Sequence, residues 1–240
     1  MRLVSYNIHK GIGGSDRLYR LERVVRVIEH EHPDLICLQE VDRNVSRSRF
    51  HDQPRLLAEH FGFAHSLFQF NHKVKDGGYG NLVLSRWPVR EHHHLSLRLG
   101  SKKNRGAQLA VVETPCGALR LVNWHLGLAE AERQWQVRHL LQHGLFRGLD
   151  DLPTLIAGDC NDWRNTLAKG AFAGSGLLPL TTPPSRFRSF PAWLPLGSLD
   201  KAFACPRVRL ERAHVVRSRL AQRASDHLPL VVDFELDSGA

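Results

Sequence analysis

The 240-residue sequence has few cysteines and no long apolar run. Its four cysteines are far apart and form no Cys-x-x-Cys pair: they are Cys37, Cys116, Cys160 and Cys205. This spacing argues against a disulfide framework or a thiolate zinc site, and it favours a reducing compartment. No apolar run approaches the roughly 18 residues of a membrane span, and no signal peptide precedes the first predicted strand, which starts at Arg2. We therefore expect a cytoplasmic protein without a transmembrane segment.

The sequence also lacks a linker or a low-complexity tract. A chain of this length can bury a substantial core, and we expect residues 1–240 to form a single domain. The charges are unbalanced, because 33 Lys and Arg stand against 24 Asp and Glu, which gives a formal net charge of +9. Such a charge favours a polyanionic partner: a nucleic acid, an anionic membrane surface or a phosphorylated substrate. An ordinary basic surface explains it equally well, so charge alone does not decide the function.

Apolar patterns predict many strands and few helices. Residues 2–8 and 34–40 are predicted to be buried strands, and between them Leu18, Leu21, Val25 and Ile28 recur at helical spacing. Further helices are expected near residues 53–61 and 129–146, and further strands near 64–70, 80–86, 89–97, 107–114, 118–125, 153–158, 198–204, 207–216 and 228–236. Strands of mixed length with helices kept apart in sequence favour two packed sheets flanked by helices.

Polar side chains lie at the ends of several predicted strands. Asn7 and Glu40 stand at the ends of the first two strands, and Gly158-Asp159-Cys160-Asn161 follows the apolar run 154–157. Ser225-Asp226-His227 directly precedes the last strand. Strand ends can hold such groups rigidly at the rim of a sheet, where chemistry on a substrate needs them. The pattern predicts one active site.

The residue types in this set suit a magnesium site. The carboxylates are Glu40, Asp159, Asp200 and Asp226, the amides are Asn7 and Asn161, and the imidazoles are His125 and His227. A few hard oxygen ligands, completed by water and substrate phosphate, are typical of Mg²⁺ and poor for zinc. A Mg²⁺ ion beside two imidazoles is equipped for displacement at phosphorus. Hydrolysis of a phosphate ester is therefore expected, provided that these residues converge in the fold.

Seven segments occur in the order seen in one known superfamily. They are Ser5-Tyr6-Asn7-Ile8, Gln39-Glu40-Val41, Gly80-Asn81-Leu82-Val83-Leu84-Ser85-Arg86, Asn123-Trp124-His125-Leu126, Gly158-Asp159-Cys160-Asn161, Leu199-Asp200 and Ser225-Asp226-His227. From residue 3 to about residue 234 the chain resembles the endonuclease/exonuclease/phosphatase superfamily, which includes deoxyribonuclease I, abasic endonucleases, sphingomyelinases and inositol polyphosphate 5-phosphatases. The resemblance implies an α/β (α+β) fold: a four-layer α-β-β-α sandwich of two mixed sheets, with the site at one edge of the sheets.

The resemblance also implies roles for individual residues. Glu40 resembles the principal ligand of Mg²⁺, for which Mn²⁺ can substitute, and Asn7 and Asp226 lie near the ion. Asp159 resembles the carboxylate that aligns or deprotonates the attacking water, and Asn161 the amide that holds the phosphate.

Four further residues receive roles from the same resemblance. His227 would contact the scissile phosphate and be oriented by Asp200, although a purely structural role is the strongest alternative for Asp200. His125 falls where deoxyribonuclease I and the sphingomyelinases have an active-site histidine. Arg105 resembles a phosphate-facing arginine of deoxyribonuclease I and is the predicted substrate-binding residue.

Departures from the family's sequence pattern narrow the range of expected substrates. Abasic endonucleases have a second Asn where this chain has His9, and a tyrosine where His125 falls, so that activity ranks low. The leading interpretation is a nuclease that acts on DNA or RNA. A sphingomyelinase-like lipid phosphodiesterase, a small-molecule phosphatase and a non-catalytic nucleic-acid-binding module remain alternatives. The segment 186–193 interleaves cations with aromatic residues and could stack bases, contact an anionic lipid surface or cover the edge of the core.

Overall fold

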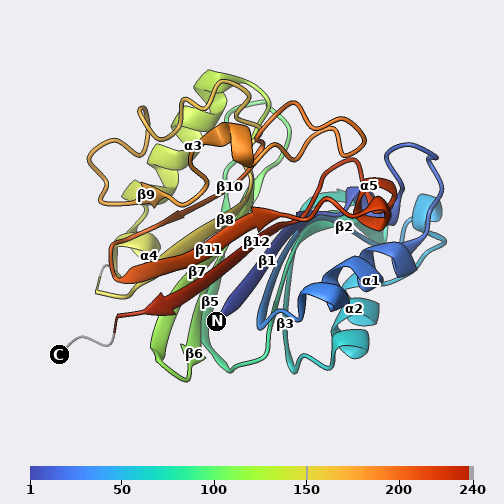
Figure 1. Cartoon of the computed structure of the whole chain (residues 1–240), viewed down its shortest axis with the longest axis horizontal. Helices are drawn as coiled ribbons and strands as arrows, with labels where there is room; N and C mark the ends of the chain where they lie inside the picture. The colour runs from blue at the N-terminus through green and yellow to red at the C-terminus, as the bar shows by residue number, and fades with distance from the viewer. Residues whose placement is uncertain (150, 238–240) are drawn as a thin grey trace.

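The computed structural model describes residues 1–149 and 151–237, which form two six-stranded sheets packed face to face (Figure 1). The first sheet has the order β11 (Val208–Val215), β12 (Leu230–Leu236), β1 (Arg2–Asn7), β2 (Leu35–Arg43), β4 (Gly77–Ser85) and β3 (His65–Val74). The second has the order β5 (Val89–Ser96), β6 (Gly106–Thr114), β7 (Gly117–His125), β8 (Thr154–Asp159), β10 (Asp200–Ala204) and β9 (Leu178–Pro179). Both sheets are mixed.

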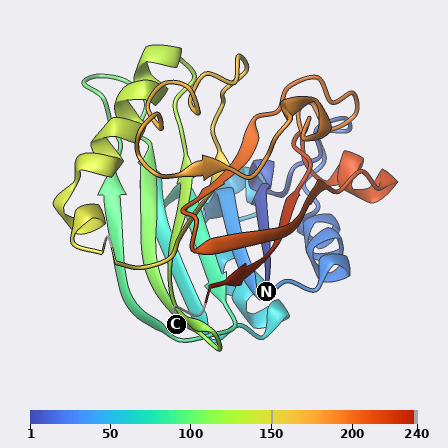
Figure 2. The same cartoon turned by 60° about the vertical axis from the view of Figure 1, so that its left-hand side comes forward.

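Helices cover the outer faces of the two sheets. On the first sheet lie α1 (Leu21–Glu31) and α2 (Gln53–Phe61), and α5 (Arg219–Ala224) packs against α1. On the second lie α3 (Glu130–Gln142) and α4 (Gly144–Arg147), as the turned view shows (Figure 2). Short 3₁₀ helices are formed by His9–Gly11, Ser46–Ser48 and Pro184–Arg186. The layers are therefore α-β-β-α, which confirms the predicted fold class. No helix within residues 1–149 and 151–237 is long and apolar enough to cross a bilayer.

Local sequence explains where the helices begin and end. The side chain of Asp52 caps α2 by accepting from the Arg55 backbone N–H, Pro54 lies in the first turn, and Gly62 ends the helix at φ 65°. The periodicity that predicted α1 holds for Leu21 and Ile28, which are buried, but Leu18 precedes the helix and is 49% exposed. Because Leu18 lies in the turn before the helix, its spacing from Leu21 was coincidental.

The space between the sheets is polar near the predicted site. Asn123 of β7 is fully buried, and its Nδ2 lies 3.0 Å from the Leu38 carbonyl oxygen of β2 and 3.1 Å from that of Leu82 in β4. Its Oδ1 accepts a hydrogen bond of 2.8 Å from Gln39 Nε2. Since Gln39 precedes Glu40, these bonds fix β2 against β7 next to a predicted site residue.

Two parallel strand pairs bring the predicted site residues to one edge. In β1 and β2, Asn7 stands opposite Gln39, and in β7 and β8, His125 stands opposite Asp159. The antiparallel strand β10 starts at Asp200, also opposite Asp159. Parallel strands end at the same edge of a sheet, so the two sheets present these side chains together.

Candidate active site

A β-bulge positions Glu40. We expected the second strand to end at Glu40, but β2 continues to Arg43, and its register with β4 shifts between Leu38 and Val41. Glu40 has a φ of 57°, a left-handed conformation that is uncommon for a residue other than glycine. Bulges re-aim side chains beside active sites, and strained backbone is often kept where function requires it. The bulge therefore singles out Glu40 within an otherwise regular strand.

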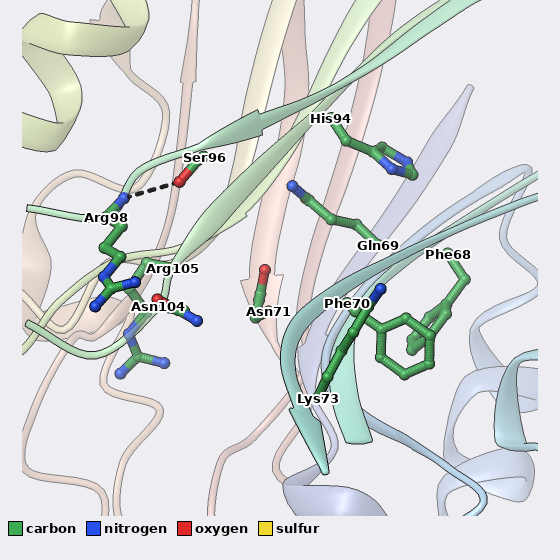
Figure 3. Close-up of a pocket in the computed structure, with 10 residues that line it drawn as sticks. All are labelled: Phe68, Gln69, Phe70, Asn71, Lys73, His94, Ser96, Arg98, Asn104 and Arg105. Carbon is green, nitrogen blue, oxygen red and sulfur yellow. Dashed lines mark hydrogen bonds between the residues drawn. The ribbon is translucent and has the colours of Figure 1, made fainter. Parts of the chain in front are cut away.

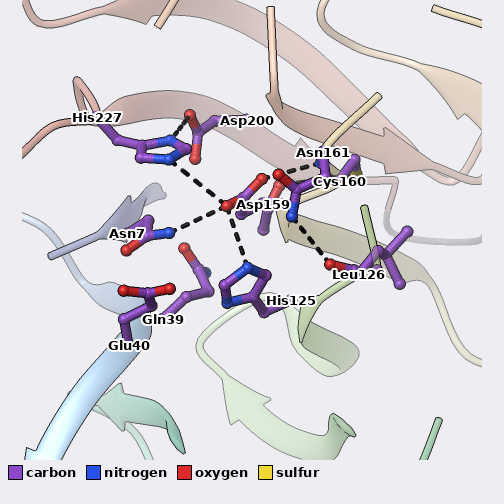
Figure 4. Close-up of polar contacts among 12 residues, drawn as sticks. Asn7, Gln39, Glu40, His125, Leu126, Asp159, Cys160, Asn161, Asp200 and His227 are labelled. Atoms are coloured by element: carbon purple, nitrogen blue, oxygen red, sulfur yellow. Dashed lines mark hydrogen bonds and ion pairs between the residues drawn. The ribbon is translucent and has the colours of Figure 1, made fainter. Parts of the chain in front are cut away.

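Asp159 is the centre of the polar contacts in Figure 4. Its Oδ2 accepts a hydrogen bond of 3.0 Å from Asn7 Nδ2, and its Oδ1 accepts one of 2.9 Å from the Asn161 backbone N–H. The same Oδ2 lies 3.3 Å from His125 Nε2 and 3.6 Å from His227 Nε2. Burial raises the pKa of Asp159 to about 6, although the positive charge of His227 and the two hydrogen bonds oppose the shift. A carboxylate with this pKa is a better proton acceptor near neutral pH than an exposed one.

His227 is held between two carboxylates. Its Nδ1 lies 2.8 Å from Oδ2 of Asp200, which also accepts a hydrogen bond of 2.5 Å from the Ser189 hydroxyl. Burial alone disfavours the charged ring, but Asp200 and Asp159 outweigh burial and raise the pKa of His227 to about 10. His227 is therefore an imidazolium at neutral pH.

His125 has the opposite protonation state. Its side chain is buried, and burial together with the nearby charge of Arg105 holds the pKa of His125 well below its usual range. Its Nδ1 is buried without a hydrogen-bond partner. One neutral and one charged imidazole thus flank the same carboxylate oxygen of Asp159.

The three predicted metal ligands all contact the 3₁₀ helix that follows β1. Glu40 forms an ion pair with Lys10, Asn7 Oδ1 accepts a hydrogen bond of 3.0 Å from the His9 backbone N–H, and Asp226 Oδ1 lies 3.8 Å from His9 Nδ1. Burial opposes ionisation of Glu40, but the charge of Lys10 outweighs burial and holds the pKa of Glu40 below its usual range. The Lys10 ammonium group marks the position as one that favours a cation. Carboxylate and amide oxygens are the donors that Mg²⁺ prefers, so the residues fit this ion.

A different set of groups in the described residues has the spacing of metal ligands. Ligand atoms of Asp159, Asp200 and His227 lie within 4.8 Å of one another, and all three residues are buried. Both ring nitrogens of His227, however, already face carboxylates. An imidazolium has no free lone pair for a metal ion, so the Glu40 set fits a metal better.

Comparisons with known proteins agree with this geometry. The model of the Endonuclease/Exonuclease/phosphatase family matches residues 4–227. The chain belongs to this family. One family relative is the uncharacterized protein YbhP of Escherichia coli (strain K12), which is 27% identical over 245 residues that cover 98% of this chain and 96% of YbhP.

Solved structures of the endonuclease/exonuclease/phosphatase family share the fold. The family protein from Beutenbergia cavernae DSM 12333 has a TM-score of 0.84 and 25% identity, with 98% of this chain and 71% of that chain covered. A mannosyl-6-phosphatase from Bacteroides thetaiotaomicron VPI-5482 has a TM-score of 0.75 and 16% identity, with 98% and 100% covered. The predicted superfamily and the fold of two mixed sheets are confirmed.

The structure joins six of the predicted site residues through direct polar contacts: Asn7, His125, Asp159, Asn161, Asp200 and His227. Glu40 and Asp226 instead contact Lys10 and His9, in the 3₁₀ helix that follows β1. Arg105 lies outside the hydrogen-bonded set: it is 5% exposed, and its Nε and Nη1 have no hydrogen-bond partner. The Asn161 Nδ2 donates to the Leu126 carbonyl oxygen at 2.9 Å, so a bound phosphate would compete for this amide.

Sequence reasoning missed Lys10 and Ser189. Lys10 follows Asn7 closely, and its φ of 64° turns the chain back toward Glu40. Ser189 belongs to the segment 186–193, for which the sequence left open whether it stacks bases, contacts lipid or covers the edge of the core. There the ring of Phe190 lies 4.8 Å from that of His227, and the Ala192 N–H donates to the Asp226 carbonyl oxygen at 2.7 Å. This loop therefore forms one wall of the site.

Proposed function

We propose that this chain is a Mg²⁺-dependent phosphodiesterase whose substrate is DNA or RNA, with residues 1–240 as one domain and a cytoplasmic location. The observation that carries the proposal is the buried Asp159 carboxylate between a neutral His125 and a charged His227. Membership of a family of phosphoester hydrolases supports it. Four free cysteines support a reducing compartment.

The protein's own residues can orient water and stabilise charge at phosphorus. Asp159 orients the attacking water and accepts a proton from it, because the pKa of Asp159 lies near neutrality. The imidazolium of His227 donates to a phosphoryl oxygen as negative charge develops, and Asp200 keeps its ring in place. Asn161 Nδ2 supplies a further hydrogen-bond donor to the phosphate when it leaves the Leu126 carbonyl oxygen. Neutral His125 has a single N–H, and its Nε2 faces Asp159.

Glu40, Asn7 and Asp226 would hold the metal ion. Mg²⁺, or Mn²⁺ in its place, supplies positive charge that stabilises a phosphoryl or leaving oxygen. Lys10 competes for Glu40 in the absence of a metal ion, and its flexible side chain can withdraw.

Cations stacked on aromatic rings beside the site favour a nucleic acid as substrate. Lys10, Arg47 and Lys103 each lie 5.5 Å from the centroid of the Tyr79 ring. Lys73 lies 5.5 Å and Arg43 lies 5.9 Å from the centroid of the Phe70 ring. Arg47 and Arg43 are also paired with acidic residues, which lowers their free charge. Cations next to rings suit a strand whose backbone is anionic and whose bases are flat.

One observation favours a lipid phosphodiesterase as the second candidate. The wall beside His227 exposes large apolar side chains: Trp163 is 51% exposed, Trp193 53%, Leu194 59% and Leu196 60%. The Trp163 ring lies 5.8 Å from Phe190, which contacts His227. Exposed apolar side chains next to cations are typical of a surface that contacts lipid.

A direct comparison of substrates tests the proposal. The purified protein is incubated with Mg²⁺ and DNA, RNA, vesicles of sphingomyelin or phosphatidylglycerol, and a set of phosphomonoesters. We expect cleavage of DNA or RNA with a kcat/KM at least ~100-fold above that of headgroup release, and binding that weakens steeply with salt. Predominant headgroup release would replace the nuclease by the lipid enzyme, and turnover of monoesters alone would reject both.

A surface variant sharpens the comparison. Trp193→Ser combined with Leu194→Ser changes only exposed side chains. In a lipid enzyme these substitutions lower hydrolysis of vesicles and spare hydrolysis of short oligonucleotides. In the proposed nuclease, cleavage of long DNA or RNA stays within about twofold of the unsubstituted protein.

A further inference from the structure

A cavity of about 530 Å³ is lined by ten residues that include Arg105 (Figure 3). Its walls come from β3, from the end of β5 and from the residues just before β6. β3 and β5 are edge strands of the two sheets, so the cavity lies where these edges meet. None of the hydrogen-bonded residues around Asp159 lines it.

One charge in the lining of this cavity is buried and has no anionic partner among the described residues. Arg105 lines the cavity and is 5% exposed, yet its Nε and Nη1 have no hydrogen-bond partner. A buried, unpaired guanidinium is costly, and its forked donors match a phosphate. Such a group is best explained by an anion that completes its hydrogen bonds.

The rim of the cavity adds positive charge. Lys73 and Arg98 line it from exposed positions on opposite sides, and Asp and Glu are absent from its described lining. Two amide oxygens that line the cavity, Gln69 Oε1 and Asn71 Oδ1, also lack hydrogen-bond donors. These oxygens are buried beneath the lining, so the accessible cations determine the ligand, which we expect to be an anion such as a phosphate group.

The cavity is close enough to the site for one substrate to occupy both. Arg105 lies two residues before Ala107, which pairs with Trp124 next to His125, and the charge of Arg105 helps to depress the pKa of that histidine. Lys103, two residues before Arg105, lies over the same Tyr79 ring as Lys10, and Lys10 contacts Glu40. The loop that carries Arg105 thus extends from the cavity to the Tyr79 ring, which Lys10 also contacts.

We infer that this cavity is a subsite for a second phosphate of the substrate, one sugar away from the phosphate that is hydrolysed. Arg105 is its buried cation, and Lys73 and Arg98 attract the anion at the rim. The inference rests on the proposed phosphodiesterase activity for its kinetic test, and a binding test stands without that activity.

The kinetic test compares two substrates that differ by one phosphate. Thymidine 5′-(p-nitrophenyl phosphate) is hydrolysed with and without a 3′-phosphate, and release of p-nitrophenol is followed with Mg²⁺ present. We expect the 3′-phosphate to raise kcat/KM about tenfold or more. The double variant Lys73→Gln, Arg98→Gln brings the ratio of the two kcat/KM values close to one. Arg212→Gln, an exposed substitution in β11 at the opposite edge of the first sheet, keeps the ratio of the unsubstituted protein.

Arg105 has its own variant. Arg105→Met keeps most of the side-chain volume and removes the unpaired charge. If Arg105 binds an anionic ligand, this variant melts at a higher temperature than the unsubstituted protein in phosphate-free buffer. It also loses the preference for the substrate with the 3′-phosphate. A lower melting temperature with an intact preference would show a structural role and overturn the inference.

Binding separates failure of the subsite from failure of the proposed function. Thymidine 3′,5′-bisphosphate is titrated calorimetrically in EDTA, with thymidine 5′-phosphate as the reference. We expect the bisphosphate to bind at least tenfold more tightly and the Lys73→Gln, Arg98→Gln variant to lose that advantage. Equal binding of the two nucleotides, or an advantage that survives the double substitution, refutes the subsite. An intact advantage in a protein that hydrolyses neither ester refutes only the proposed function.

Discussion

The Nδ1 atom of His227 lies 2.8 Å from Oδ2 of Asp200, and both side chains are buried. The two residues are 27 positions apart in the chain, and Asp200 comes from the second sheet whereas His227 precedes the last strand of the first. The contact therefore joins the two sheets at the site. It also leaves Nε2 of His227 facing Asp159, where the substrate phosphate is expected.

Substitution of Asp200 by Asn tests whether this contact orients His227. The substituted amide would keep the size of the side chain but remove the charge that stabilises the imidazolium. We expect kcat on a phosphodiester to fall about 100-fold, with a smaller loss in Ser189→Ala, which removes only a hydrogen bond to the same oxygen. The measurement is steady-state kcat, with the melting temperature of each variant as the control. A D200N protein of unchanged kcat would leave Asp200 with a structural role alone.

Metal removal tests the ligand assignment at Glu40. EDTA should abolish turnover, and added Mg²⁺ or Mn²⁺ should restore it. In Glu40→Gln the concentration of Mg²⁺ that gives half-maximal rate should rise by about tenfold or more, since one anionic ligand is lost. Glu22→Gln on α1, where the exposed carboxylate pairs only with Arg20 among the described residues, serves as the matched control. Turnover that persists in EDTA would contradict the assignment.

Asn123 should be important for stability rather than for chemistry. Asn123→Ala removes the amide that bonds to carbonyl oxygens of β2 and β4 and leaves those buried groups unsatisfied. We expect the free energy of unfolding to fall by about 3 kcal/mol. Gln142→Ala, at an exposed position at the end of α3, should change it by less than ~0.5 kcal/mol. Urea denaturation measures both, and equal values for the two variants would show that the inter-sheet bonds contribute little.

His94 should make stability depend on pH. Burial, followed by the charges of His92 and His93, lowers the pKa of His94 below its ordinary value of 6.5. Below that value the unfolded chain binds more protons at this residue than the folded protein, so stability falls as the pH drops through this range. His94→Gln should therefore lose less stability between pH 7 and pH 5. Melting temperatures in phosphate-free buffer give the comparison, and an identical loss in both proteins would exclude this contribution.

The sequence predicted most strands and the residues at their ends, because buried strands are continuous apolar runs. The runs before Asn7 and Asp159 became β1 and β8, and their polar termini meet at one edge. The bulge at Glu40 could not be predicted in this way, because it depends on how β2 pairs with β4. Strand pairing involves two segments, so it cannot be predicted from the composition of one segment alone.

The position of the wall beside His227 was even harder to predict from the sequence than the bulge at Glu40. The segment 170–197 has little periodicity, and its place is set by bonds to distant backbone, such as the Leu228 N–H to the Ser189 carbonyl oxygen at 2.8 Å. The partner of Asp200 and the contact of Phe190 with His227 follow from those bonds. Arg105, in contrast, was selected from the resemblance, and only the structure shows that two of its guanidinium nitrogens lack a partner among the described residues.

The most direct test of the account is the turnover of bis(p-nitrophenyl) phosphate with Mg²⁺ by the unsubstituted protein and by Asp159→Asn. The account predicts measurable turnover by the former and a kcat lower by about 1,000-fold in the variant, because the amide cannot accept a proton from water. Circular dichroism should show the same fold in both proteins. Equal kcat values in two folded proteins, or no phosphodiesterase activity in the unsubstituted one, would contradict it.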